Sequence, residues 1–163
     1  MCFVIMGGMQ WSEFNIVTEQ APKGIISFEF ARDMNTARAI IASWREAHVM
    51  GYAGFNVGLD FLFLLIYPVV IGLVIVLISS GFPKGNIFRG TGFFISWLVI
   101  LAALLDAVEN VSLINLLTDS MNSNWVVTAY YCSISKFILI GLGITFIVVG
   151  GIAHGILRAL KGE

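Results

Sequence analysis

Two carboxylates and an amide interrupt a long apolar run in the second half of the chain. Asp106, Glu109 and Asn110 lie inside residues 92–117, a run long enough to cross a bilayer as a helix. Ionisable side chains at that depth are costly, and they usually face protein or water and not lipid. Their i, i+3, i+4 spacing places all three on one face of a helix. The run therefore predicts a transmembrane helix with a polar face.

The predicted free energy of inserting this helix is close to zero. Its fifteen Leu, Ile, Val and Phe residues contribute about −4 to −9 kcal/mol. Asp106 and Glu109 together cost about +5 to +7 kcal/mol on the same scale. We therefore expect this helix to depend on neighbouring helices, or on protonation of its carboxylates.

Composition and two further apolar runs place the whole chain in the membrane class. Of its 163 residues 58% are hydrophobic and 12% charged, against about 45–50% and 25% in soluble domains. Residues 52–80 and 125–153 are the other predicted spans. The net charge of −1 gives no basic surface for nucleic acid. We expect one membrane domain over residues 1–163, whose main partner is the lipid bilayer.

The residues before the first span carry a weaker pattern. Residues 1–24 show little periodicity and are expected at the membrane surface. Residues 25–48 are expected to form one amphipathic helix, which either lies in the headgroup plane or dips into the protein interior. Its apolar stripe comprises Ile26, Phe30, Met34, Ala37, Ile41, Trp44 and His48.

These segments predict an all-α fold, an integral membrane bundle of four helices. Three helices span the membrane, and the fourth is the amphipathic or re-entrant N-terminal helix. Lys84, Arg89, Arg158 and Lys161 share one predicted side, while the loop over residues 118–124 has no basic residue. The positive-inside rule then favours a multi-pass protein of the cell membrane with its C-terminus in the cytoplasm.

The deep charges of the three spans fall at similar depth. At 1.5 Å per residue, Asp60 lies about 12 Å below residue 52, and Lys136 about 16 Å below residue 125. Counted from residue 118, Glu109 lies at about 13 Å and Asp106 at about 18 Å. We therefore expect Asp60, Asp106, Glu109, Asn110 and Lys136 to form one buried polar network.

Three carboxylates against one ammonium leave that layer with a formal charge of −2, which a low-dielectric interior does not tolerate uncompensated. Protonation of one or two carboxyls is one solution. Entry of Arg32, Arg38 or both from the N-terminal helix, which also carries Glu29, is a second. A hard cation on oxygen ligands is a third, so the metal content stays open. The sequence does not specify a cofactor.

Glycines predict where helices approach closely. Gly54 and Gly58 have the GxxxG spacing, and Gly151 and Gly155 repeat it in the last span. We expect these four glycines to lie at helix–helix contacts.

The polar elements resemble those of small bacterial integral membrane proteins of no assigned activity. The resemblance rests on Gly58–Phe63, on the DxxEN element at residues 106–110, and on Lys136-Phe137, and it covers roughly residues 25–155. It implies a four-helix membrane fold and no particular reaction.

Three function classes remain open. The leading hypothesis is a non-enzymatic accessory or structural subunit of a membrane assembly, because no nucleophile–base pair or phosphate loop has a spacing that compels a reaction. The second is a homo-oligomeric transporter or channel for an ion, proton or small solute, lined by the buried carboxylates. The third is a membrane-embedded enzyme that acts on a lipid through an acid–base pair or a bound metal.

Overall fold

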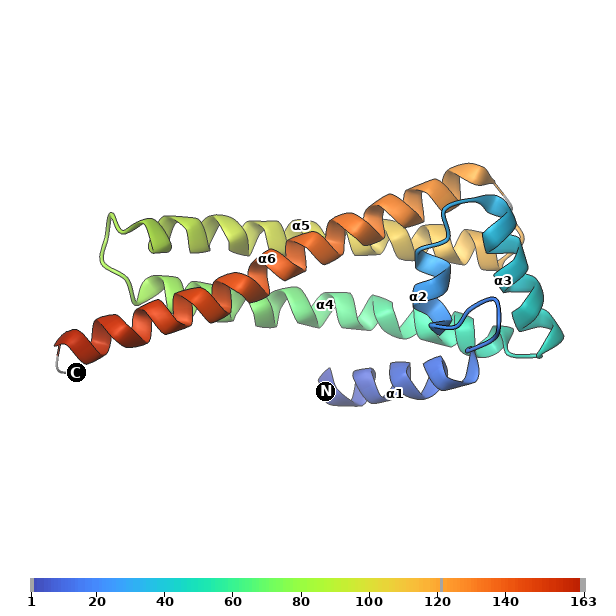
Figure 1. The fold of residues 1–163 in the computed structure, drawn as a ribbon, viewed down its shortest axis with the longest axis horizontal. Helices are drawn as coiled ribbons and strands as arrows, with labels where there is room; N and C mark the ends of the chain where they lie inside the picture. The colour runs from blue at the N-terminus through green and yellow to red at the C-terminus, as the bar shows by residue number, and fades with distance from the viewer. Residues whose placement is uncertain (1, 121, 162–163) are drawn as a thin grey trace. The chain divides into compact units, whose positions relative to one another are not determined.

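The computed structural model describes residues 2–120 and 122–161, which form six α-helices and no β-strand (Figure 1). The expected all-α bundle is therefore confirmed. The helices are α1 (Cys2–Asn15), α2 (Gly24–Glu29), α3 (Met34–Glu46), α4 (Met50–Ser80), α5 (Ile87–Leu117) and α6 (Ser123–Lys161).

Helices α4, α5 and α6 are long and apolar enough to cross a membrane. They contain the predicted spans 52–80, 92–117 and 125–153, and each extends beyond its prediction at one end or both. The extensions of α5 and α6 carry polar residues, such as Arg89 before the α5 span, which a hydropathy pattern leaves out of the helix.

The chain divides into two compact units. The first unit comprises Met1–Ile66 and Leu105–Ile134, and the second comprises Tyr67–Leu104 and Ser135–Glu163. Each of the three long helices contributes one part to each unit.

The core of the first unit joins the short helices to the ends of the long ones. Trp44 of α3 is fully buried, its indole N–H donates to the carbonyl of Ile16 at 2.7 Å, and its ring meets Phe28 edge-on at 5.3 Å. Leu113 of α5 and Val126 of α6 belong to the same cluster. The short helices α2 and α3 therefore share one hydrophobic core with the ends of the long helices.

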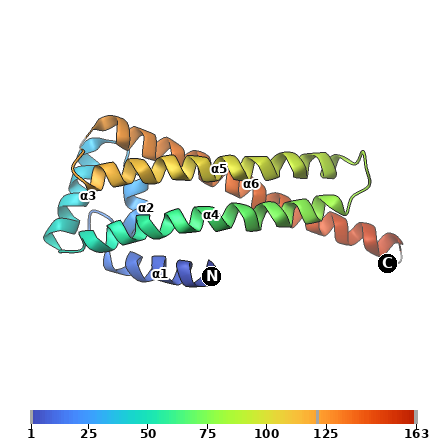
Figure 2. The same ribbon diagram turned by 180° about the vertical axis from the view of Figure 1, so that it is seen from behind.

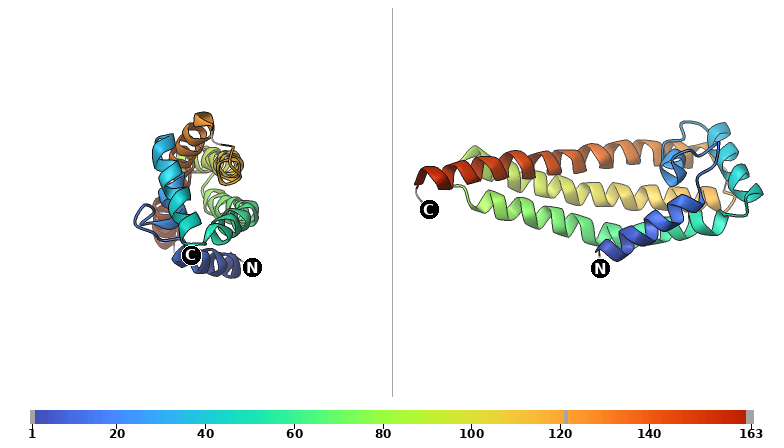
Figure 3. Two further views of the ribbon diagram at one scale, coloured as in Figure 1. Left: turned by 90° about the vertical axis from the view of Figure 1, so that its right-hand side faces the viewer. Right: turned by 60° about the horizontal axis from the view of Figure 1, so that its bottom comes forward.

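Helix α1 lies beside the first part of α4, as the views of Figures 1, 2 and 3 agree. A side chain on Gly8 would come within 2.9 Å of Leu59, and the ring of Trp11 meets Tyr52 at 5.2 Å. The sequence did not predict this helix, because its apolar residues show no helical periodicity. It is instead apolar on most sides, with Val4 exposed and Ile5 buried.

The expected single helix over residues 25–48 is wrong, because the structure divides it into α2 and α3. Asp33 caps α3, and its carboxylate accepts the backbone N–H groups of Asn35 at 2.9 Å and Thr36 at 3.0 Å. The stripe is buried only after this break: Ile26 and Phe30 are exposed, whereas Ala37, Ile41 and Trp44 are buried.

Within the first unit α3 crosses the ends of α4 and α5 (Figure 1). Arg45 near its end forms an ion pair with Asp119, which follows α5. The helix turns its charged residues outward, which is the arrangement of an interfacial amphipathic helix.

The second unit contains a hairpin of α4 and α5, joined by the loop after Ser80, and the later part of α6. Ile75, Val99 and Phe146 form its core, one residue from each helix. Phe82 in the loop stacks on Phe88 at 5.1 Å, and the guanidinium of Arg89 donates to the Phe82 carbonyl at 3.0 Å.

The glycines that mediate close packing differ from those predicted. A side chain on Gly54, Gly58 or Gly155 would meet nothing within 4 Å, and one on Gly151 would make only ordinary contact with Ile78 at 3.9 Å. For contacts within the chain the prediction is wrong for Gly54, Gly58 and Gly155, because the GxxxG spacing does not say which face of a helix is inside; Gly151 does contact α4.

Gly92 of α5 is the tightest helix contact in the second unit. A side chain there would overlap the hydroxyl of Ser79 on α4 and lie 2.6 Å from the ring of Phe146 on α6. Three helices therefore approach one another at a position that only glycine fits.

We predict that Gly92→Ala destabilises the protein by about 1–3 kcal/mol, because the added methyl group overpacks a closed contact. Unfolding by SDS titration, followed by circular dichroism, measures the effect. Gly90→Ala is the matched control two residues earlier, where a side chain meets nothing within 4 Å. It should leave stability unchanged or slightly higher; equal midpoints for the two variants would contradict the contact.

Candidate functional site

One face of α5 is buried and polar, and the opposite face is exposed and apolar. Asp106, Glu109 and Asn110 are 3%, 0% and 1% exposed, whereas Leu104 and Val108 are 61% and 47% exposed. The helical period of 3.6 residues produces this division, because residues three and four apart share a face. The carboxylates are therefore enclosed by protein.

A side-chain hydrogen bond connects this face to α4. The Nδ2 amide of Asn110 donates to Oδ2 of Asp60 at 2.8 Å, and both side chains are buried. Two spans are thus joined by polar groups inside the first unit. An amide–carboxylate bond of this kind satisfies one of the acceptor positions that burial would otherwise leave without water.

Lys136 is also buried, at 5% exposure, but it belongs to the second unit. The boundary between the units crosses α6 between Ile134 and Ser135. The Lys136 ammonium lies 5.2 Å from the centre of the Phe137 ring. The predicted network therefore has Asp60, Asp106, Glu109 and Asn110 in one unit and its lysine in the other.

Of the three predicted partners from the N-terminal region, only Glu29 is buried. It is 7% exposed at the end of α2, where its backbone carbonyl lies 3.4 Å from the hydroxyl of Ser133 on α6, which donates to the Ala129 carbonyl of its own helix at 2.7 Å. Arg32 and Arg38 are exposed, and the Arg32 guanidinium lies 5.6 Å above the ring of Tyr130. Of the three solutions for the surplus charge, entry of Arg32 or Arg38 into the polar layer is contradicted, because the chain breaks after α2 and α3 turns its charges outward.

Four carboxylates are buried among the described residues of the first unit, those of Glu29, Asp60, Asp106 and Glu109. Each of them takes part in an interaction in the structure. Among the described residues, no three His, Cys, Asp or Glu side chains are grouped as ligands for one metal ion.

A second polar junction, which the sequence did not predict, joins α1 to α4. The Nδ2 amide of Asn56 donates to the hydroxyl of Ser12 at 2.7 Å and to the carbonyl of Met9 at 3.0 Å. Asn56 and Asp60 are four residues apart on α4, so they share one polar helix face. That spacing was the signal available in the sequence.

Glu13 of α1 completes this junction. Its Oε1 accepts the backbone N–H of Ile25 at 3.1 Å, and its Oε2 lies 3.4 Å from the Asn56 amide. Partial burial raises the pKa of Glu13 above its ordinary 4.5, against the opposing effect of the N–H groups of Ile25 and Ile26. Its side chain also lines a cavity of about 320 Å³ beside Lys23 and Phe14.

The comparisons with known proteins give no relative: no protein-family model, no curated protein and no solved structure matches this chain.

We predict that Asn110→Ala destabilises the protein by about 1 kcal/mol, since a hydrogen bond between membrane helices contributes about 0.6–1.7 kcal/mol. Unfolding by SDS titration measures the change. Asn115→Ala on the same helix is the control, because the Asn115 amide only reaches the carbonyl of Val111 one turn away. This control should lower the free energy of unfolding by less than about 0.5 kcal/mol. An equal loss in both variants would contradict the hydrogen bond to Asp60.

We predict that Glu13→Gln removes part of the pH dependence of stability. Because the folded state raises the pKa of Glu13, the carboxyl contributes stability below 4.5 that is lost as pH rises through the folded value. Glutamine stays neutral and keeps an oxygen that accepts the Ile25 N–H.

Hydrogen exchange of α1 at about pH 4 and about pH 8 tests this expectation. Wild-type protection should fall with rising pH, while protection in Glu13→Gln stays level. Glu19→Gln, at an exposed side chain, should behave as wild type. A wild-type α1 that is better protected at the higher pH would overturn the assignment.

Proposed function

We propose that this chain is a non-enzymatic subunit of a larger membrane assembly, and that its buried polar side chains fix the packing of its helices. The observation that carries the proposal is the set of polar contacts within the first unit. Asn110 joins α5 to α4, and Asn56 joins α4 to α1. Each contact uses a buried polar group to hold two helices together, which is how polar groups stabilise membrane bundles.

A face of α6 supports the assembly part of the proposal. Gly141, Val148, Ile152 and Gly155 lie within about 60° of one another around the helix, and all four are exposed. A side chain on either glycine would meet nothing within 4 Å. Small residues flanking exposed β-branched ones allow a helix of another chain to approach closely.

Native mass measurement after gentle extraction from the host membrane tests the proposal. The expected mass exceeds that of one chain, and Gly141→Leu should release the partner by filling the α6 face. Gly90→Leu, another glycine with nothing within 4 Å, is the control and should leave the assembly intact. A lone monomer in wild type would count against a subunit role.

A second candidate function is transport of an ion, proton or small solute through a homo-oligomer. Burial of Asp60, Asp106 and Glu109 within candidate spans favours it, since intramembrane carboxylates commonly mark such pathways. Glu109→Gln in proteoliposomes is the test. If proton and cation fluxes are the same in wild type and variant, transport through this face is excluded.

The proposed location is the cell membrane, with the C-terminus in the cytoplasm on the side of the basic residues Lys84, Arg89, Arg158 and Lys161. Lys23, Arg32, Arg38 and Arg45 precede α4 and match them in number, so the orientation needs a direct test. A reporter fused to the C-terminus that is active only in the cytoplasm should be active. Activity of a periplasmic or extracellular reporter there would reverse the orientation.

A further inference from the structure

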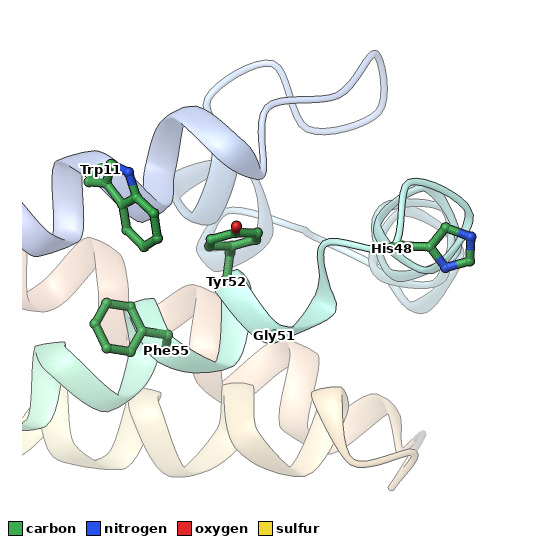
Figure 4. Close-up of a pocket in the computed structure, with 5 residues that line it drawn as sticks. All are labelled: Trp11, His48, Gly51, Tyr52 and Phe55. Atoms are coloured by element: carbon green, nitrogen blue, oxygen red, sulfur yellow. The ribbon is translucent and has the colours of Figure 1, made fainter.

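A cavity of about 260 Å³ lies in the first unit at the beginning of α4. Trp11, His48, Gly51, Tyr52 and Phe55 line it (Figure 4). The three aromatic rings gather at one end, where Trp11 meets Tyr52 at 5.2 Å and Phe55 at 6.4 Å. His48 precedes α4 at the other end, and its imidazole points away from the three rings. The wall of the cavity is therefore mainly aromatic, and its polar groups are the indole N–H of Trp11 and the hydroxyl of Tyr52.

Two side chains of the lining offer hydrogen-bond donors. The indole of Trp11 carries an N–H and the hydroxyl of Tyr52, which can also accept, carries an O–H; none of the described lining residues carries a carboxylate. Such a lining favours a ligand rich in acceptor oxygens, such as a phosphodiester with neighbouring ester carbonyls.

The position along α4 places these donors at the headgroup level. The candidate span begins at Met50, so Gly51 and Tyr52 lie in its first turn. Trp and Tyr are enriched at this depth because their rings are apolar and their N–H and O–H groups remain near water.

An exposed apolar face continues from the cavity along α4. Gly51, Phe55, Gly58, Leu62 and Leu65 lie within about 80° of one another around the helix, and all are exposed. From Phe55 to Leu65 this face extends about 15 Å, half of the roughly 30 Å hydrocarbon core. That is the depth which the acyl chains of one leaflet occupy.

We propose that this cavity binds one glycerophospholipid, with its phosphate and ester oxygens toward the N–H of Trp11 and the hydroxyl of Tyr52 and an acyl chain along the α4 face. A Cβ atom at Gly51 or Gly58 would meet nothing within 4 Å, so the space over both glycines is open to the lipid. The inference requires that α4 is embedded in a bilayer, and it is independent of the subunit role.

Lipid retention measures the site directly. Protein reconstituted in phosphatidylcholine nanodiscs is transferred to detergent, and the phosphatidylcholine that stays bound is counted by native mass spectrometry. Wild type should keep one lipid. A Cβ atom at position 51 would meet no protein atom within 4 Å, so Gly51→Leu should fold; its side chain occupies space of the cavity and should weaken retention about tenfold.

Two further variants separate the alternatives. Gly141→Leu, whose added side chain lies on α6, should retain the lipid as wild type does. His48 has a positive φ of 59°, which asparagine also tolerates, so His48→Asn keeps the backbone while it removes an imidazole that points away from the three rings; it should also retain the lipid.

Retention of the lipid by Gly51→Leu, or no retained lipid in wild type, would overturn the proposal. A change in oligomeric mass of Gly51→Leu at unchanged lipid count would assign the face to a second copy of the chain instead. If the subunit role is wrong and the lipid site is correct, wild-type protein is a monomer that still carries its lipid.

Discussion

The rest of the structure depends on the cost of placing carboxylates in an apolar helix. Asp106 and Glu109 would face lipid if α5 stood alone, and this cost would cancel most of the gain from its apolar residues. Enclosure by protein removes the exposure to lipid, and it requires neighbours that offer polar contacts. On the same face of α5, the amide of Asn110 provides such a contact for the carboxylate of Asp60 on α4. Packing of the spans against one another therefore also encloses the charged side chains.

The short N-terminal helices extend this principle to the end of the first unit. The indole N–H of Trp44 on α3 donates to the carbonyl of Ile16. The amide of Asn56 on α4 donates to the hydroxyl of Ser12 on α1. In both cases a polar group that burial would leave without water finds a partner on another segment. Such hydrogen bonds are directional and fix how the helices are placed. Apolar contacts between membrane helices discriminate less, because lipid is as apolar as leucine. A protein built in this way is suited to present fixed faces to a partner or a lipid.

The sequence was sufficient for features that depend on one helix at a time. Hydropathy located the three spans, and the spacing of Asp106, Glu109 and Asn110 indicated their common buried face. Features that depend on two elements were missed. The break between α2 and α3 is determined by capping at Asp33, which competes locally with a continuous apolar stripe. The close contact at Gly92 depends on Ser79 and Phe146, far away in sequence, while GxxxG spacing at Gly54 and Gly58 is equally compatible with an outward face. The docking of α1 likewise depends on the tertiary partner Asn56.

The central claim is that the polar face of α5 lies inside protein within the bilayer. Nitroxide scanning by electron paramagnetic resonance, one substituted residue at a time along α5 in liposomes, tests it most directly. Oxygen dissolved in the lipid should reach labels at Leu104, Val108 and Val111, which are exposed. Labels at Asp106, Glu109 and Leu113, which are buried, should be shielded both from oxygen and from a water-soluble nickel reagent. Access of the nickel reagent to positions 106 and 109, or uniform oxygen access around the helix, would contradict the account.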